Sequence, residues 1–163
     1  MLIAVGSHSR KTGKSSLVCE LVRAIPEARW TVVKISGHEH GVAGAWSLEE
    51  EHDAGGRHDT SRYLEAGAAR AWLLRHSPGG LTAAVPALRQ LIAAAGNTIL
   101  ESNRILEFIQ PDLHVFVRNE ATAEFKESAR AWAARADVTV LAGDPESLAA
   151  LVARIKTAGG LHW

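Results

Sequence analysis

The chain begins, after Met1, with Leu2-Ile3-Ala4-Val5-Gly6-Ser7-His8-Ser9-Arg10-Lys11-Thr12-Gly13-Lys14-Ser15-Ser16. A short apolar run typical of a β-strand enters a polar loop, and an amphipathic helix follows directly after the Gly-Lys-Ser tripeptide. This order of strand, loop and helix is the context of a phosphate-binding loop, or P-loop. Glycine lets the backbone curl so that N–H groups converge, and the helix N-terminus adds unpaired donors. We therefore predict that the segment from Ser9 to Ser16 binds nucleotide phosphates.

Within this loop, Lys14 and Ser15 have the most specific expected roles. Lys14 would carry its charge to the outer phosphates, and the Ser15 hydroxyl would coordinate Mg²⁺. The loop departs from the pattern G-x-x-x-x-G-K-[ST] because His8 stands where the first glycine is expected. Histidine tolerates a positive φ better than most residues, so we expect either a left-handed turn at His8 or flexibility at Gly6. A chance Gly-Lys-Ser before a helix is the alternative, and the flanking strand and helix favour nucleotide binding.

Composition sets limits on the function. The chain has 163 residues, of which 47% are apolar and 22% charged, as in ordinary globular proteins, and we expect one domain over residues 1–158 with a short tail at 159–163. The 18 basic residues equal the 18 acidic ones, which gives no field toward nucleic acid or an anionic membrane. Cys19 is the only cysteine, and no apolar run reaches membrane-spanning length. These features predict a cytoplasmic protein.

Strand-like and helix-like segments alternate along the chain. The expected strands are 2–6, 30–36, 70–75, 98–103, 113–118 and 138–141, and the expected helices start near residues 15, 59, 81, 124 and 145. Pro86 lies in the first turns of the third helix and is a possible start for it. This alternation predicts an α/β protein with a P-loop NTPase-like three-layer fold, in which helices cover both faces of a mostly parallel sheet.

Residues 37–58 are the least regular part of the chain. They hold five glycines, the acidic run Glu49-Glu50-Glu51 and four histidines, namely His38, His40, His52 and His58. A glycine-rich stretch of this length predicts a mobile, switch-like loop, with the three glutamates facing water. The histidines suit a borderline transition metal, although their spacing is not diagnostic. A metal-delivery NTPase is therefore one alternative function.

Two acids are candidates for chemistry beside the P-loop. Glu101 follows the apolar run Ile99-Leu100, where a strand-end acid would hold Mg²⁺ or orient an attacking water. Asp59 would be a second acid near the metal, or the N-cap of the helix that follows it. Lys34 lies near the end of the second strand, where ligands collect in open α/β sheets. The predicted catalytic set is Lys14, Glu101 and Asp59, and the predicted metal set is Ser15, Glu101 and Asp59.

Recognition of the base is less well defined. A guanine-specific Asn-Lys-x-Asp motif is absent after the strand at 113–118, where the chain reads Arg118-Asn119-Glu120-Ala121. Asn119 and the loop at Asp144 are the candidates for contact with the base. The residues alone leave GTP and ATP open.

Three pieces of the chain together resemble one family. They are Ser9 to Ser16; Val33-Lys34-Ile35 followed by His38 and His40; and Asp59-Thr60-Ser61-Arg62-Tyr63-Leu64-Glu65-Ala66-Gly67-Ala68. In order and spacing they resemble the MobB-type molybdopterin-guanine dinucleotide biosynthesis proteins, which are P-loop GTP-binding proteins. The resemblance covers about the first two-thirds of the chain.

The resemblance implies a dimeric accessory protein that binds GTP and Mg²⁺. Such a protein would assist a molybdopterin nucleotidyltransferase and hydrolyse nucleotide weakly. Two departures stand out: His8 replaces the first P-loop glycine, and Ser102-Asn103 follows Glu101 where the family has Gly and often a lysine. A non-hydrolysing adapter that holds nucleotide or cofactor for a partner enzyme is the other alternative.

Overall fold

The computed structural model describes residues 1–9, 11–37, 44–121 and 127–161. In this part of the chain the strands form one seven-stranded sheet in the order β3-β4-β2-β5-β1-β6-β7. Neighbouring strands are parallel except β3 and β4, which are antiparallel. The strands are β1 (Leu2–Ser7), β2 (Thr31–Gly37), β3 (Trp46–Glu51), β4 (Arg70–His76), β5 (Thr98–Glu101), β6 (Leu113–Arg118) and β7 (Val138–Leu141).

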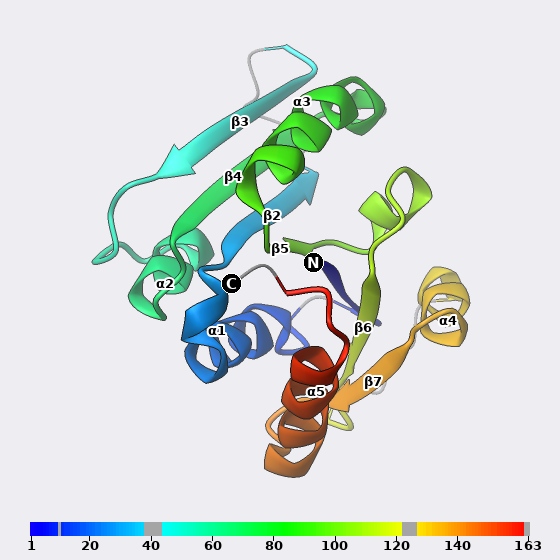
Figure 1. Cartoon of the computed structure of the whole chain (residues 1–163). Helices are drawn as coiled ribbons and strands as arrows, with labels where there is room; N and C mark the ends of the chain where they lie inside the picture. Colours follow the sequence, from blue (N-terminus) through cyan, green and yellow to red (C-terminus); the bar gives the residue numbers. More distant parts are fainter. Residues whose placement is uncertain (10, 38–43, 122–126, 162–163) are drawn as a thin grey trace.

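Helices cover both faces of the sheet (Figure 1), which confirms the expected α/β three-layer fold. Helices α1, α2 and α5 lie on one face, and α3, the short 3-10 helix η2 and α4 lie on the other. The helical segments are α1 (Lys14–Ala24), η1 (Pro26–Ala28), α2 (Asp59–Glu65), α3 (Gly80–Ala95), η2 (Arg104–Glu107), α4 (Glu127–Ala134) and α5 (Pro145–Thr157).

Two hydrophobic cores, one on each face, hold the layers together. Successive residues of a strand point to opposite faces, so Val32 and Ile99 enter the core under α1, while Val33 and Leu100 enter the core under α3. This double burial explains why the central strands read as continuous apolar runs.

The position of β1 decides where a ligand can bind. It lies between β5 and β6, because the chain first builds the sheet on one side of β1 and later on the other. Such a change of direction leaves a crevice at the carboxyl ends of the strands. The register also places Lys34 of β2 opposite Glu101 of β5, and Glu101 opposite Val5 of β1.

The expectation of an irregular loop over residues 37–58 is wrong for residues 46–51. Residues 46–51 form the edge strand β3, which pairs antiparallel with β4. Trp46 and Leu48 pack against the second core, and this burial outweighs the polar character of the segment. Residues 38–43, which include His38 and His40, lie outside the described residues.

The three glutamates of β3 are engaged with other side chains. Glu50 pairs with Arg70 at 2.6 Å, and Glu49 with Arg75 at 3.4 Å. Glu51 accepts hydrogen bonds from the Thr60 hydroxyl at 2.9 Å and from the Ser61 hydroxyl at 3.2 Å. Glu49 is exposed to water as expected, whereas Glu50 and Glu51 are half-buried, and Glu51 fixes the start of α2 to the end of β3.

Other element boundaries differ from the sequence prediction. Helix α3 begins six residues before Pro86, which lies inside it. Asp59 is the first residue of α2 rather than its cap, because the capping position belongs to His58. Leu161 in the tail is 9% exposed and belongs to the first core, while Trp163 lies outside the described residues. No helix in the described ranges combines the length and apolarity needed to cross a bilayer.

Candidate functional site

The loop between β1 and α1 turns on two residues with positive φ. These are Lys11 (φ 60°) and Gly13 (φ 98°), and Gly13 is the residue before the first turn of α1. His8 has no positive φ and is 2% exposed, so the expected left-handed turn at His8 is wrong. The first hydrogen bond of α1 runs from Leu17 N–H to Gly13 C=O at 2.9 Å. The N–H groups ahead of it find no carbonyl in the helix and can donate hydrogen bonds to an anion.

Lys14, at the start of α1, lies across this loop. Its Nζ donates to Ser7 Oγ at 2.7 Å and to Ser9 C=O at 3.4 Å. Burial lowers the pKa of the Lys14 ammonium group, an effect that nearby Glu101 opposes and nearby Lys34 strengthens. Lys14 therefore has weak neutral partners, which a phosphate group would replace with stronger, charge-assisted hydrogen bonds.

Asn103 holds the beginning of the P-loop. Its Oδ1 accepts from Ser7 N–H at 2.8 Å, and its Nδ2 donates to Ser7 C=O at 2.6 Å. A Cβ at Gly6 would lie 2.1 Å from Asn103 Oδ1, so Gly6 is required for this close approach and not for a left-handed turn. Ser102-Asn103 departs from the MobB-type pattern, and Asn103 has a structural role there, because it forms hydrogen bonds with two backbone groups of Ser7.

We expect Asn103→Ala to lower the free energy of unfolding by about 1–3 kcal/mol, because it removes the Asn103 partner of two backbone groups of the buried Ser7. Urea unfolding followed by circular dichroism measures this change. The neighbouring variant Ser102→Ala is the control and should stay within about 0.5 kcal/mol of the wild type. Equal stabilities of the two variants would show that the Asn103 clamp contributes nothing.

The two predicted acids and Ser15 come together beside the P-loop. Ser15 Oγ lies 3.1 Å from Glu101 Oε1 and 2.9 Å from Glu101 Oε2. Lys34 Nζ forms an ion pair with Asp59 Oδ2 and lies 3.3 Å from Glu101 Oε1. The three predicted metal ligands are thus brought to one point, around the ammonium group of Lys34.

The charges of this cluster are mutually stabilising. Burial acts to lower the pKa of Lys34, but the charges of Glu101 and Asp59 outweigh it and raise that pKa above the usual 10.5. Burial acts to raise the pKa of Asp59, but its bond to Lys34 and the charges of Lys34 and Arg62 lower it below 3.8. Lys34 and Asp59 are therefore both ionised at neutral pH.

Two residues of α2 complete the cluster, and the sequence argument did not assign them a role. Tyr63 is fully buried and donates from its hydroxyl to Glu101 Oε2, while burial and the Glu101 charge raise the pKa of Tyr63. Arg62 donates to Asp59 Oδ1 at 3.1 Å. Arg62 and Tyr63 follow Asp59 by three and four residues, a spacing that places all three side chains on the same side of a helix. This spacing was the sequence signal that could have identified them.

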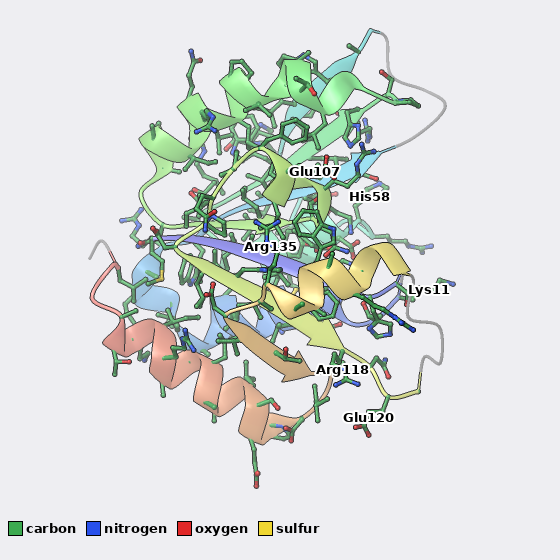
Figure 2. All side chains as sticks on the ribbon, turned by 90° about the vertical axis from the view of Figure 1, so that its right-hand side faces the viewer. Lys11, His58, Glu107, Arg118, Glu120 and Arg135 are labelled. Carbon is green, nitrogen blue, oxygen red and sulfur yellow. The ribbon has the colours of Figure 1, made fainter. Side chains whose placement is uncertain are left out.

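A cavity of about 660 Å³ opens over these residues. The residues that line it include the P-loop residues Lys11, Thr12, Gly13, Lys14, Ser15 and Ser16, together with Lys34, Asp59, Arg62 and Glu101. Figure 2 shows Lys11 at the same end of the molecule as Arg118 and Glu120, the end at which the parallel strands finish. Arg10, also predicted to bind nucleotide, lies outside the described residues.

The two candidates for base contact lie apart from this cluster. Asn119 and Asp144 line a cavity of about 390 Å³ between the β6 and β7 ends. Asp144 is the N-cap of α5, accepting from Ser147 N–H at 3.0 Å, and Asn119 Oδ1 accepts from Ala121 N–H at 2.9 Å. A third cavity of about 280 Å³ lies between them and the P-loop, since it is lined by both Gly13 and Asp144.

The histidines do not gather in the part of the chain that the structure describes. No group of three or more His, Cys, Asp or Glu side chains that could hold a metal occurs there, and His52 and His58 belong to no such group. The cluster of Ser15, Glu101 and Asp59 has two carboxylates and a hydroxyl, which are hard oxygen donors. Hard oxygen donors fit Mg²⁺ rather than a transition metal.

Comparison with known proteins identifies the fold. The chain is similar to LpxK from Aquifex aeolicus, in a crystal structure of its "apo" form in complex with ATP, with a TM-score of 0.54 and 18% sequence identity. The match covers 87% of this chain and 48% of LpxK, so this chain spans about half the length of that protein. No family model matches the chain, and no curated protein sequence does. The likeness establishes the P-loop NTPase-like fold.

Proposed function

We propose that this protein binds a nucleoside triphosphate with Mg²⁺ through its P-loop. One observation carries the proposal: Lys14, Ser15, Asp59 and Glu101 surround a single cavity at the N-terminus of α1. The helix N-terminus and Lys14 supply positive potential for the phosphates. Ser15, Asp59 and Glu101 would hold Mg²⁺, which would bridge the phosphates and neutralise their charge.

The neighbouring cavities support one direction for the nucleotide. The P-loop cavity and the 280 Å³ cavity share Gly13 and Ser16, and the latter shares Leu141 to Asp144 with the 390 Å³ cavity. Phosphates over the P-loop would thus continue into sugar and base along the β7–α5 loop. Asn119 and Asp144 remain our candidates for the base contact. Because their side chains already form hydrogen bonds within the protein, the contact would use backbone groups of the same two loops.

We propose GTP as the nucleotide and molybdenum cofactor biosynthesis as the process. The proposal is supported by the resemblance of three segments of the chain to the MobB-type proteins. Three residues of the third segment, Asp59, Arg62 and Tyr63, lie in the cluster around Lys34 and Glu101. A molybdopterin nucleotidyltransferase would be the partner, and the protein would act as a homodimer. The likeness to LpxK, crystallised with ATP, makes ATP the competing nucleotide.

The geometry favours slow hydrolysis. Both Glu101 oxygens accept hydrogen bonds, from Ser15, Lys34 and Tyr63, so this carboxylate has little capacity left to activate a water. Arg62 is held in an ion pair with Asp59, so it is not available as an arginine finger, and we expect slow turnover. If the rate of hydrolysis is zero, the protein is an adapter that only binds nucleotide.

A thermal-shift panel of GTP, ATP and GDP, each with Mg²⁺, tests the proposal. A nucleotide at one hundred times its Kd should add about 2.7 kcal/mol, which corresponds to a rise of about 5–10 °C for a chain of this size. We expect the largest rise with GTP. No rise with any nucleotide would contradict nucleotide binding, and a larger rise with ATP would remove GTP and the molybdopterin role. Phosphate release with and without the nucleotidyltransferase then separates an NTPase from an adapter.

A further inference from the structure

The ammonium group of Lys34 lies at the point where the proposed metal site has its oxygen donors. Its Nζ contacts Asp59 Oδ2, Glu101 Oε1 at 3.3 Å and Ser15 Oγ at 3.4 Å. These are the same three residues that would hold Mg²⁺. No other cation is recorded in contact with all three across the described residues, since Lys14 bonds to Ser7 and Ser9, and Arg62 to Asp59 and Ser16.

The backbone fixes Lys34 in this position. Lys34 and Glu101 are register partners in the neighbouring strands β2 and β5, so their side chains leave the sheet on the same face. Glu101 is only 4% exposed and the Lys34 side chain 24% exposed, so the pair is shielded from water. Two carboxylates this close and partly buried repel each other strongly unless a cation lies between them.

We propose that Lys34 is a built-in counter-cation that competes with Mg²⁺ for this site. Mg²⁺ requires oxygen ligands at about 2.1 Å in an octahedron, so it and the Lys34 ammonium group cannot occupy the same three oxygens together. Metal binding would therefore displace Lys34 into the cavity above. The inference rests on the proposed nucleotide function, because the phosphates provide the displaced ammonium group with a new anionic partner.

Coupled binding of metal and nucleotide follows from this competition. Mg²⁺ alone would have to remove an ammonium group from its ion pairs without compensation, so the nucleotide-free protein binds divalent cations weakly. With nucleotide present, the cost of displacing Lys34 is offset, and the two ligands enter together. The lysine thus prevents the metal site from filling without nucleotide.

Mn²⁺ binding to the nucleotide-free protein tests the competition directly. Electron paramagnetic resonance measures free Mn²⁺ in titrations of the wild type, Lys34→Met and Lys34→Arg. Methionine keeps the length of the side chain but removes the charge, so Lys34→Met should bind Mn²⁺ about tenfold more tightly or better. Lys34→Arg should bind as weakly as the wild type. The surface variant Lys156→Met, which removes a lysine from its ion pair with Glu27, should also match the wild type.

Unchanged Mn²⁺ affinity in folded Lys34→Met would overturn the proposal. A second measurement on the wild type covers the case in which that variant fails to fold. In ¹⁵N-lysine-labelled protein, the Lys34 Nζ resonance should shift on addition of Mg²⁺ with GTP and stay constant with Mg²⁺ alone at the same concentration. A constant resonance in both, while Lys14 responds, would likewise overturn it.

The two proposals fail in different ways. If no nucleotide stabilises the wild type, the Mn²⁺ titrations still decide whether Lys34 competes with a divalent cation for the site. If GTP stabilises the wild type but Lys34→Met gains no affinity for Mn²⁺, nucleotide binding stands and the role of Lys34 does not.

Discussion

Lys14→Ala is expected to remove nearly all of the thermal stabilisation that nucleotide gives this protein. Lys14 is the basic group of the P-loop nearest the N-terminus of α1, and loss of one partner of a shielded charge pair costs about 3 kcal/mol, or about a hundredfold in Kd. At a GTP concentration of one hundred times the wild-type Kd, the gain in stability would fall from about 2.7 to about 0.4 kcal/mol. Differential scanning fluorimetry with and without Mg²⁺-GTP measures this loss.

The nucleotide-free stability of Lys14→Ala should change little, since the hydrogen bonds of Lys14 to described residues go to the Ser7 hydroxyl and the Ser9 carbonyl. This makes the loss of the nucleotide response interpretable. Lys156→Ala is the matched control, because Lys156 pairs with Glu27 and does not line the P-loop cavity. Full stabilisation of Lys14→Ala by GTP would mean that the phosphates bind elsewhere.

Glu101→Gln is expected to remove the dependence of nucleotide binding on Mg²⁺. The amide has nearly the shape of the carboxylate and can still accept from Tyr63 and Ser15, but it lacks the charge that a hard divalent cation requires. Loss of such a partner weakens metal affinity about 10–100-fold. In the wild type, GTP should stabilise more with Mg²⁺ than with EDTA, and in Glu101→Gln the two conditions should nearly coincide.

Glu107→Gln is the control for this variant, because Glu107 is exposed on η2 and outside the P-loop cavity (Figure 2). It should retain the full difference between Mg²⁺ and EDTA. If Glu101→Gln also retains this difference, Glu101 only supports Tyr63 and Ser15, and the metal has other ligands.

Much of this site was predictable from local sequence. The Gly13-Lys14-Ser15 tripeptide between an apolar strand and an amphipathic helix indicated the loop of the proposed site, and Ile99-Leu100-Glu101 indicated its acid, and both line the same cavity. Both are short-range patterns, in which strand periodicity and the helix start fix where a side chain emerges. The same patterns predicted the alternation of strands and helices and hence the layered fold.

Other features escaped the sequence argument because they depend on long-range partners. The edge strand β3 forms where Trp46 and Leu48 meet the second core, and its glutamates find Arg70 and Arg75 on β4. Gly13 has the left-handed conformation expected of the P-loop glycine, whereas the second left-handed residue of the loop is Lys11 and not His8. Pattern matching assigned the turn to the family's glycine position, whereas the folded backbone places it nearer the helix.

By itself the sequence determined the order of the elements, the apolar faces that build two cores, and the loop at the amino end that can hold an anion. These follow from periodicity and from residue-specific backbone preferences, which act over a few residues. Only the tertiary structure decided that Lys34 lies among the predicted ligands Ser15, Asp59 and Glu101, and that Asn103 holds Ser7. Strand order and register bring those residues together from β2, α2, β5 and the loop after β5, and no local signal encodes which strands become neighbours.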